Sequence, residues 1–183
     1  LSLSETLTAN YRWALNDDHS FNFLLGQEGI DYQSSGFQVS TQGQNNDRLT
    51  NLLTGTRATS WPDSNSAYSY LSFFFRGEYN YKDLYYAEVA ARTDASSRFG
   101  ADHRWGMFWS LGFMWNIKNE AFLKDIEWLT SAQVKLSTGT SGNSEIPYYD
   151  HLALVSGDAN YNDEAGIYPS QSGNEELSWE QTW

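Results

Sequence analysis

Between residues 68 and 115, three long segments alternate apolar with polar side chains. The clearest runs from Trp105 to Trp115, where every second position carries a large apolar side chain. Because successive side chains of a strand point to opposite faces, a period of two predicts strands with one apolar face. The first two segments meet at Lys82 and Asp83, and a longer polar loop joins the second to the third. The stretch therefore predicts an antiparallel β-meander.

Two surroundings could cover an apolar face of this size: the interior of a soluble β-sandwich or the hydrocarbon of a membrane. Strands of globular proteins usually run ~5–6 residues. The segments here run roughly 10–13 residues, close to the ~9–11 tilted residues that span a bilayer. Trp115 also ends its segment on the same side as Tyr79, Tyr81 and Tyr85, as in an aromatic belt at a membrane interface. Strand length therefore favours the membrane.

Composition excludes several classes of protein. No apolar run approaches the ~20 residues of a membrane-spanning helix, and the negative mean hydropathy is typical of alternating barrel strands. The formal net charge of −12 argues against nucleic acid as a partner, because phosphate binding needs a basic surface. The chain has no cysteine, so no disulfide or thiolate chemistry is expected.

The rest of the chain continues the strand pattern with connections of alternating length. Short turns are expected near residues 17 and 82, and long polar loops at about 33–66 and 140–176. Outer-membrane barrels have short periplasmic turns and long extracellular loops. A sheet of about seven strands cannot stand alone in lipid, because open edges leave backbone groups unsatisfied. The predicted strands lie at about residues 5–15, 20–32, 67–81, 84–94, 105–117, 129–139 and 177–183.

Family-like motifs occur at residues 79–83, 92–100, 104–106 and 115–117, and further ones at residues 23–28, 137–143 and 173–180. Together they resemble one family, the SusC/RagA-type TonB-linked (TonB-dependent) outer-membrane transporters. The resemblance implies an all-β fold in which residues 1–183 form part of a large, 22-stranded, plugged transmembrane β-barrel. It also implies that the plug domain and the TonB-contacting segment lie outside this chain.

The resemblance implies a function as well. The chain would be part of an importer of glycans, oligosaccharides or peptides in the bacterial outer membrane. Its partners would be the rest of the barrel with its plug, a SusD-like surface lipoprotein, the TonB complex and membrane lipid. The alternative is a soluble all-β sandwich module that binds carbohydrate, and a small closed barrel is a third architecture. No cofactor is expected, and no phosphate-binding loop, nucleophile elbow or zinc-protease helix supports an enzyme.

Charged residues on the polar face are the first candidate site. If the chain is part of a barrel, these residues face the lumen. There they either contact the plug and the substrate or form ion pairs between neighbouring strands. The ion-pair interpretation is favoured. These residues are Arg76, Glu78, Glu88, Arg92 and Lys135.

Aromatic residues in or beside the long loops are the second candidate site. Their rings could stack on a sugar or on a peptide side chain, or could form an outer aromatic girdle or pack within the loops. These residues are Trp61, Tyr68, Tyr70, Tyr148 and Tyr149.

An acidic stretch offers a weak candidate for a cation site. Asp158, Asn160 and Asn162 carry side-chain oxygens at every second position, as a calcium loop does at its start. Such a loop continues with Gly at its sixth position and Glu at its twelfth, but Asp163 and Pro169 stand there. A solvated acidic loop without metal is therefore the default expectation.

Overall fold

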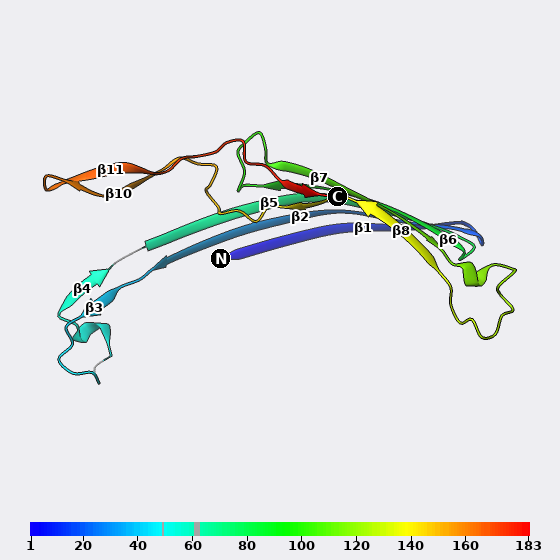
Figure 1. Cartoon of the computed structure of the whole chain (residues 1–183), viewed down its shortest axis with the longest axis horizontal. Coiled ribbons are helices and arrows are strands. Elements are labelled where there is room, and N and C mark those ends of the chain that lie inside the picture. The colour runs from blue at the N-terminus through cyan, green and yellow to red at the C-terminus, as the bar shows by residue number, and fades with distance from the viewer. Residues whose placement is uncertain (49, 61–62) are drawn as a thin grey trace.

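A computed structural model describes residues 1–48, 50–60 and 63–183, and its main feature is one long antiparallel sheet (Figure 1). This sheet has six strands in the order β1-β2-β5-β6-β7-β8, so each strand pairs with the next main strand along the chain. The all-β, antiparallel meander predicted from the sequence is thus confirmed. The strands are β1 (Ser2–Asn16), β2 (His19–Phe37), β5 (Asp63–Tyr81), β6 (Tyr85–Ser96), β7 (Trp105–Trp115) and β8 (Val134–Gly139).

The register of the strands brings the apolar residues of all six onto one face. Leu25 of β2 lies opposite Phe75 of β5, which lies opposite Ala91 of β6, and Ala91 pairs with Trp109 of β7. This face is not covered, since Met107 keeps 66% of its surface exposed. Other large apolar side chains exposed on it are Leu7, Tyr11, Trp13, Leu71, Phe73, Val89, Trp105, Leu111, Phe113, Val134 and Leu136.

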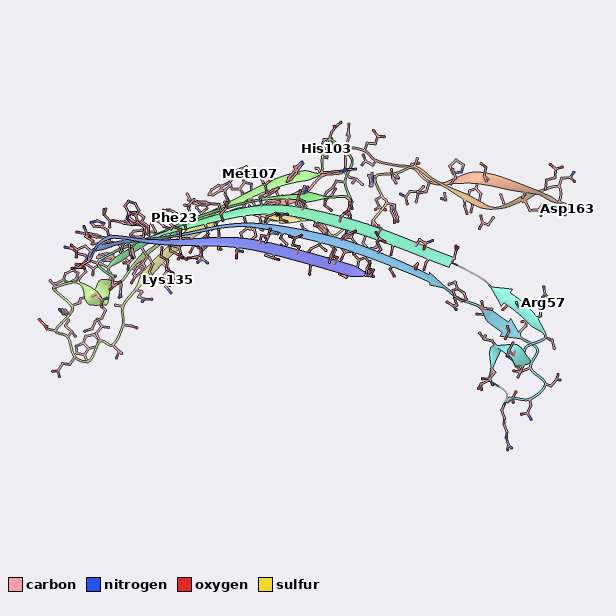
Figure 2. The ribbon with its side chains drawn as sticks, turned by 180° about the vertical axis from the view of Figure 1, so that it is seen from behind. Phe23, Arg57, His103, Met107, Lys135 and Asp163 are labelled. Atoms are coloured by element: carbon pink, nitrogen blue, oxygen red, sulfur yellow. The ribbon has the colours of Figure 1, made fainter. Side chains whose placement is uncertain are left out.

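The opposite face is polar, and most of the few buried side chains of the sheet lie on it. Ser72, Asp94 and Ser96 are the buried polar residues among those described, and Phe99 and Phe108 are the buried apolar ones. Figure 2 labels Met107 above the arched sheet and Lys135 below it, on the two opposite faces. A sandwich would bury the row from Trp105 to Trp115 under a second sheet, and the described residues contain no such cover.

The two long loops contain hairpins that the sequence analysis did not predict. Strand β2 extends to Phe37, and strand β5 begins at Asp63, so both reach into the segment expected to be a loop. Their backbone pairing continues there although neither face carries a row of apolar side chains. Beyond them, β3 and β4 form a small hairpin, and β10 and β11 form a longer one that projects from the sheet (Figure 1). Their bounds are β3 (Ser40–Gln42), β4 (Arg57–Ser60), β10 (Leu154–Tyr161) and β11 (Glu164–Gln171).

Two tight turns have the same backbone conformation. Lys82 and Asp83 between β5 and β6 both have φ of 55°, and Asn162 and Asp163 between β10 and β11 have φ of 54° and 67°. Two successive residues with positive φ are what a type I′ hairpin turn requires. The second turn explains why an acidic stretch without clear alternation still forms strands.

Some predicted elements are shorter in the structure. The strand expected from residue 129 begins at Val134, and the one expected at 177–183 is reduced to β12 (Glu180–Thr182), which pairs with β9 (Ser141–Asn143). The described residues also form two short 3₁₀ helices, Leu52–Thr54 and Ile117–Asn119. Among the described residues, no helix has the length and apolar character needed to cross a membrane.

Candidate functional site

Arg76 links two acidic residues on the polar face. Glu78 and Glu88 lie directly opposite each other on β5 and β6, an arrangement that is unfavourable for two like charges. The Nη2 atom of Arg76 lies 2.7 Å from Glu78 Oε1 and 2.8 Å from Glu88 Oε2. Glu78 also accepts a hydrogen bond from Asn22 Nδ2 of β2, 2.8 Å away. The predicted ion pairing between strands is therefore present at these residues.

Arg92 makes a second and more buried cluster. Its Nε lies 2.6 Å from Asp94 Oδ1, and its Nη2 lies 3.0 Å from both Glu28 Oε2 and Ser72 Oγ. The guanidinium also stacks over the ring of Phe74, 5.6 Å from its centroid. The partners come from β2, β5 and β6, so this one side chain ties three strands together.

We predict that replacing Arg92 by methionine destabilises the sheet by about 1–3 kcal/mol, because the buried carboxylate of Asp94 loses its partner. The Arg76→Met variant is the control, since partners that keep more than a third of their surface exposed contribute under ~1 kcal/mol. Denaturant unfolding of the protein in detergent measures both. Adding Asp94→Asn to Arg92→Met should recover part of the loss, and no recovery would contradict the assigned pairing.

Lys135 lies on the same polar face, opposite Met114 of β7. It forms no ion pair within residues 1–48, 50–60 and 63–183. The five predicted charged residues thus share one face, but the structure pairs four of them and leaves Lys135 available for another contact.

The aromatic candidates gather at the end of the polar face that lies next to the long connections. The ring of Tyr68 stacks on Tyr32 at 4.9 Å between centroids and on Tyr148 at 5.2 Å. Tyr70 contacts Tyr68 edge-on at 5.6 Å, and Tyr149 lies perpendicular to Tyr148 at 6.4 Å. We call these five residues the tyrosine cluster. The fifth predicted aromatic candidate, Trp61, lies outside the described residues.

The hydroxyl groups of the cluster fall into two kinds. Tyr70 Oη is 3.0 Å from Ser144 Oγ, and Tyr149 Oη accepts a hydrogen bond from the backbone N–H of Ala67 at 2.9 Å. The hydroxyls of Tyr32, Tyr68 and Tyr148 have no hydrogen-bond partner in the described part of the chain. Rings with free hydroxyl groups can stack on a ligand and also hydrogen-bond to it.

Sequence reasoning missed Arg98, which lies in the connection between β6 and β7. Its guanidinium carbon is 4.7 Å from the ring centroids of both Tyr68 and Tyr148. The only sequence indication was that Arg98 belongs to the family-like stretch 92–100. Its partner Tyr148 is 50 positions away in the sequence and follows no strand pattern.

The acidic candidates occupy the β10–β11 hairpin. Asp158 Oδ1 accepts a hydrogen bond from Ser156 Oγ at 2.8 Å, and hydrogen bonds from Ser156 and Tyr168 lower the pKa of Asp158. Asn160 Oδ1 accepts a bond from the backbone N–H of Asp163, and Asn162 lies in the turn. In the described ranges, no group of three or more His, Cys, Asp or Glu could hold a metal ion.

Comparison with known proteins identifies the family. No family model matches the chain. It is 31% identical over 94% of its length to the TonB-dependent receptor P39 of Formosa agariphila, and 30% identical over 90% to the TonB-dependent receptor SusC of Bacteroides thetaiotaomicron. A solved structure of the RagAB peptide transporter matches 98% of the chain with 37% identity and a TM-score of 0.90. The chain belongs to the SusC-type TonB-dependent receptors.

The chain spans 17% of the length of each of these two receptors and 20% of the matched RagAB chain. Its sheet is part of the large transmembrane β-barrel of a SusC-type receptor, which confirms the predicted fold class. The relatives are receptors and importers, so the prediction that the chain is not an enzyme is confirmed as well.

Proposed function

We propose that this chain forms part of the wall of a bacterial outer-membrane importer that takes up peptides or glycans with energy supplied through TonB. The observation that carries the proposal is the two-sided sheet, in which one exposed apolar face crosses all six strands opposite a face of ion pairs. In a barrel the apolar face contacts lipid and the polar face lines the lumen. The RagAB neighbours, described as a peptide importer, support the peptide class.

The charged residues then have two roles in the lumen. Arg76, Glu78, Glu88 and Arg92 stiffen the wall by pairing across strands. Lys135 has no such partner in the part of the chain that the structure describes. In this proposal it contacts the plug or the passing substrate. The plug, the TonB complex and a SusD-like surface lipoprotein are the partners of the full-length receptor.

The tyrosine cluster is the proposed ligand contact in this wall. The support comes from the free hydroxyls of Tyr68 and Tyr148 and from the position of the cluster at the end of the polar face that lies next to the long connections. Tyr70, Tyr149 and Trp61 are proposed for the same role, as ring surfaces beside the ligand. The β10–β11 hairpin and the β3–β4 hairpin are proposed as parts of the extracellular loops.

The test is uptake by cells that carry the full-length receptor, compared with a matched deletion strain. We expect saturable uptake of fluorescent peptides from a protein digest, or of a labelled oligosaccharide mixture, that falls to the deletion level when a protonophore collapses the proton-motive force. Whichever mixture is taken up identifies the substrate class. Uptake that is equal in both strains, or that continues at full rate with the protonophore, would overturn the proposal.

A further inference from the structure

Arg98 connects the tyrosine cluster to the backbone of a distant loop. Its guanidinium lies over the rings of Tyr68 and Tyr148 and is 5.7 Å from the centroid of Tyr70. Its Nη1 donates to the backbone carbonyls of Ser144 and Ile146, at 3.3 Å each. One side chain thus contacts both the rings of β5 and the loop segment 144–149, which supplies Tyr148 and Tyr149.

Arg98 forms no ion pair with a carboxylate within the described residues. A half-buried charge without an ion-pair partner is costly unless other groups stabilise it. Here the negative ring faces and the two carbonyl oxygens take that role. The planar guanidinium can stack and donate two hydrogen bonds in its plane at the same time, which a lysine ammonium cannot reproduce.

The backbone next to Arg98 is hydrogen-bonded to the sheet. The backbone N–H of Ser97 donates to Ser69 O at 3.0 Å, and Ser97 Oγ accepts from the N–H of Ser69 at 2.9 Å. The next residue after Arg98 is Phe99, which is only 1% exposed. Arg98 therefore reaches toward the loop from a rigid support on β5 and β6.

Two further contacts fasten the same loop segment to β5. One is a hydrogen bond between the hydroxyl groups of Tyr70 and Ser144, and the other runs from the backbone N–H of Ala67 to Tyr149 Oη. Both lie at the edges of the segment, whereas Arg98 holds its middle at Ile146 and Tyr148. Loss of Arg98 would leave the middle of the segment without a polar anchor.

From this arrangement we infer that Arg98 is a positioning residue, which holds segment 144–149 against β5 so that Tyr148 lies beside Tyr68 before the ligand arrives. The inference rests on the proposed function, in which the tyrosine cluster contacts a peptide or glycan. A preassembled site does not have to order the loop on binding, so it binds more tightly.

The test compares Arg98→Lys with Arg104→Lys in the full-length receptor. Arg104 lies in the same connection, and its side chain makes no hydrogen bond, ion pair or ring contact in the part of the chain that the structure describes. Hydrogen exchange of the purified receptor in detergent follows peptides that cover residues 144–149. Uptake of the peptide digest and of the oligosaccharide mixture by cells gives a half-saturation concentration and a maximal rate.

For Arg98→Lys we expect faster exchange in segment 144–149 and a rise of about tenfold in the half-saturation concentration at an unchanged maximal rate. Arg104→Lys should match the wild type in both measurements. Tyr148→Phe keeps the ring under the guanidinium, so it should keep slow exchange while it loses the free hydroxyl. This variant separates loss of the ligand contact from loss of the anchor.

Unchanged exchange in Arg98→Lys would overturn the inference, and so would faster exchange with unaltered uptake. If wild-type cells take up neither mixture, the proposed function fails and the ligand part of the inference fails with it. The exchange measurement does not depend on uptake and still decides whether Arg98 holds the segment.

Discussion

Replacing Leu111 by arginine should destabilise the barrel by about 2–4 kcal/mol, the cost of a cationic side chain on a lipid face near the middle of the bilayer. Leu111 lies in the centre of β7, opposite Val89 on the apolar face, and keeps 48% of its surface exposed. In lipid this exposure is favourable for leucine and unfavourable for a charge. Unfolding of the full-length receptor in lipid vesicles by denaturant measures the change.

The neighbouring Gly112→Arg variant is the matched control. Gly112 lies on the polar face opposite Glu88, and a Cβ added there would be 3.7 Å from the Cβ of Glu88, an ordinary contact. An arginine at this position can pair with Glu88, so we expect a change below ~1 kcal/mol. If the two variants lost the same free energy of unfolding, the two faces of β7 would have the same surroundings. The assignment of one face to lipid would then be wrong.

Replacing Phe99 by alanine should cost about 3–5 kcal/mol of local stability, as large-to-small changes of buried aromatic residues do. Phe99 packs against Trp179 with 5.4 Å between ring centroids, and Trp179 Nε1 donates to the carbonyl of Arg104 at 2.8 Å. Next to Phe99, Gly100 lies directly against the backbone carbonyl of Glu175, so a side chain there would not fit. These contacts attach residues 175–179 to the β6–β7 connection.

Limited proteolysis of the full-length receptor measures this local loss as faster cleavage within residues 173–179. Phe122→Ala is the control, because Phe122 is 67% exposed in the connection between β7 and β8. Its cleavage pattern should match the wild type, since surface substitutions usually change stability by less than ~0.5 kcal/mol. Protection of residues 173–179 that survives Phe99→Ala would show that another contact attaches this segment.

The alternation of side chains made the faces of the sheet predictable. In β7 every second residue from Trp105 to Trp115 is apolar, and a one-residue shift in register would turn this row to the opposite face. The polar candidates followed from the same rule, because Arg76 and Glu88 occupy the alternate positions. The alternation of side chains depends only on residues close together in the sequence. It can therefore be recognised from a short stretch of sequence.

The rest of the structure depends on partners far apart in the sequence. Arg98 meets the loop at Ser144 and Ile146, 46 and 48 positions away, and no local pattern links them. The β10–β11 hairpin depends on positive φ at Asn162 and Asp163. An acidic stretch of sequence does not by itself predict this backbone conformation. Alternation alone predicts that the strand at 129–139 begins at residue 129, whereas pairing with β7 begins only where Val134 meets Trp115.

The length of the β2–β5 pair has a mechanical consequence. Each strand has 19 residues in unbroken register, which at ~3.3 Å per residue corresponds to about 60 Å. Even when strongly tilted, such a ribbon exceeds the ~30 Å hydrocarbon layer. The part of the ribbon beyond the hydrocarbon layer is a stiff two-stranded extension of the wall. It ends near the β3–β4 hairpin. A force applied to that hairpin would be transmitted along the ribbon to Arg92 and the strands it joins.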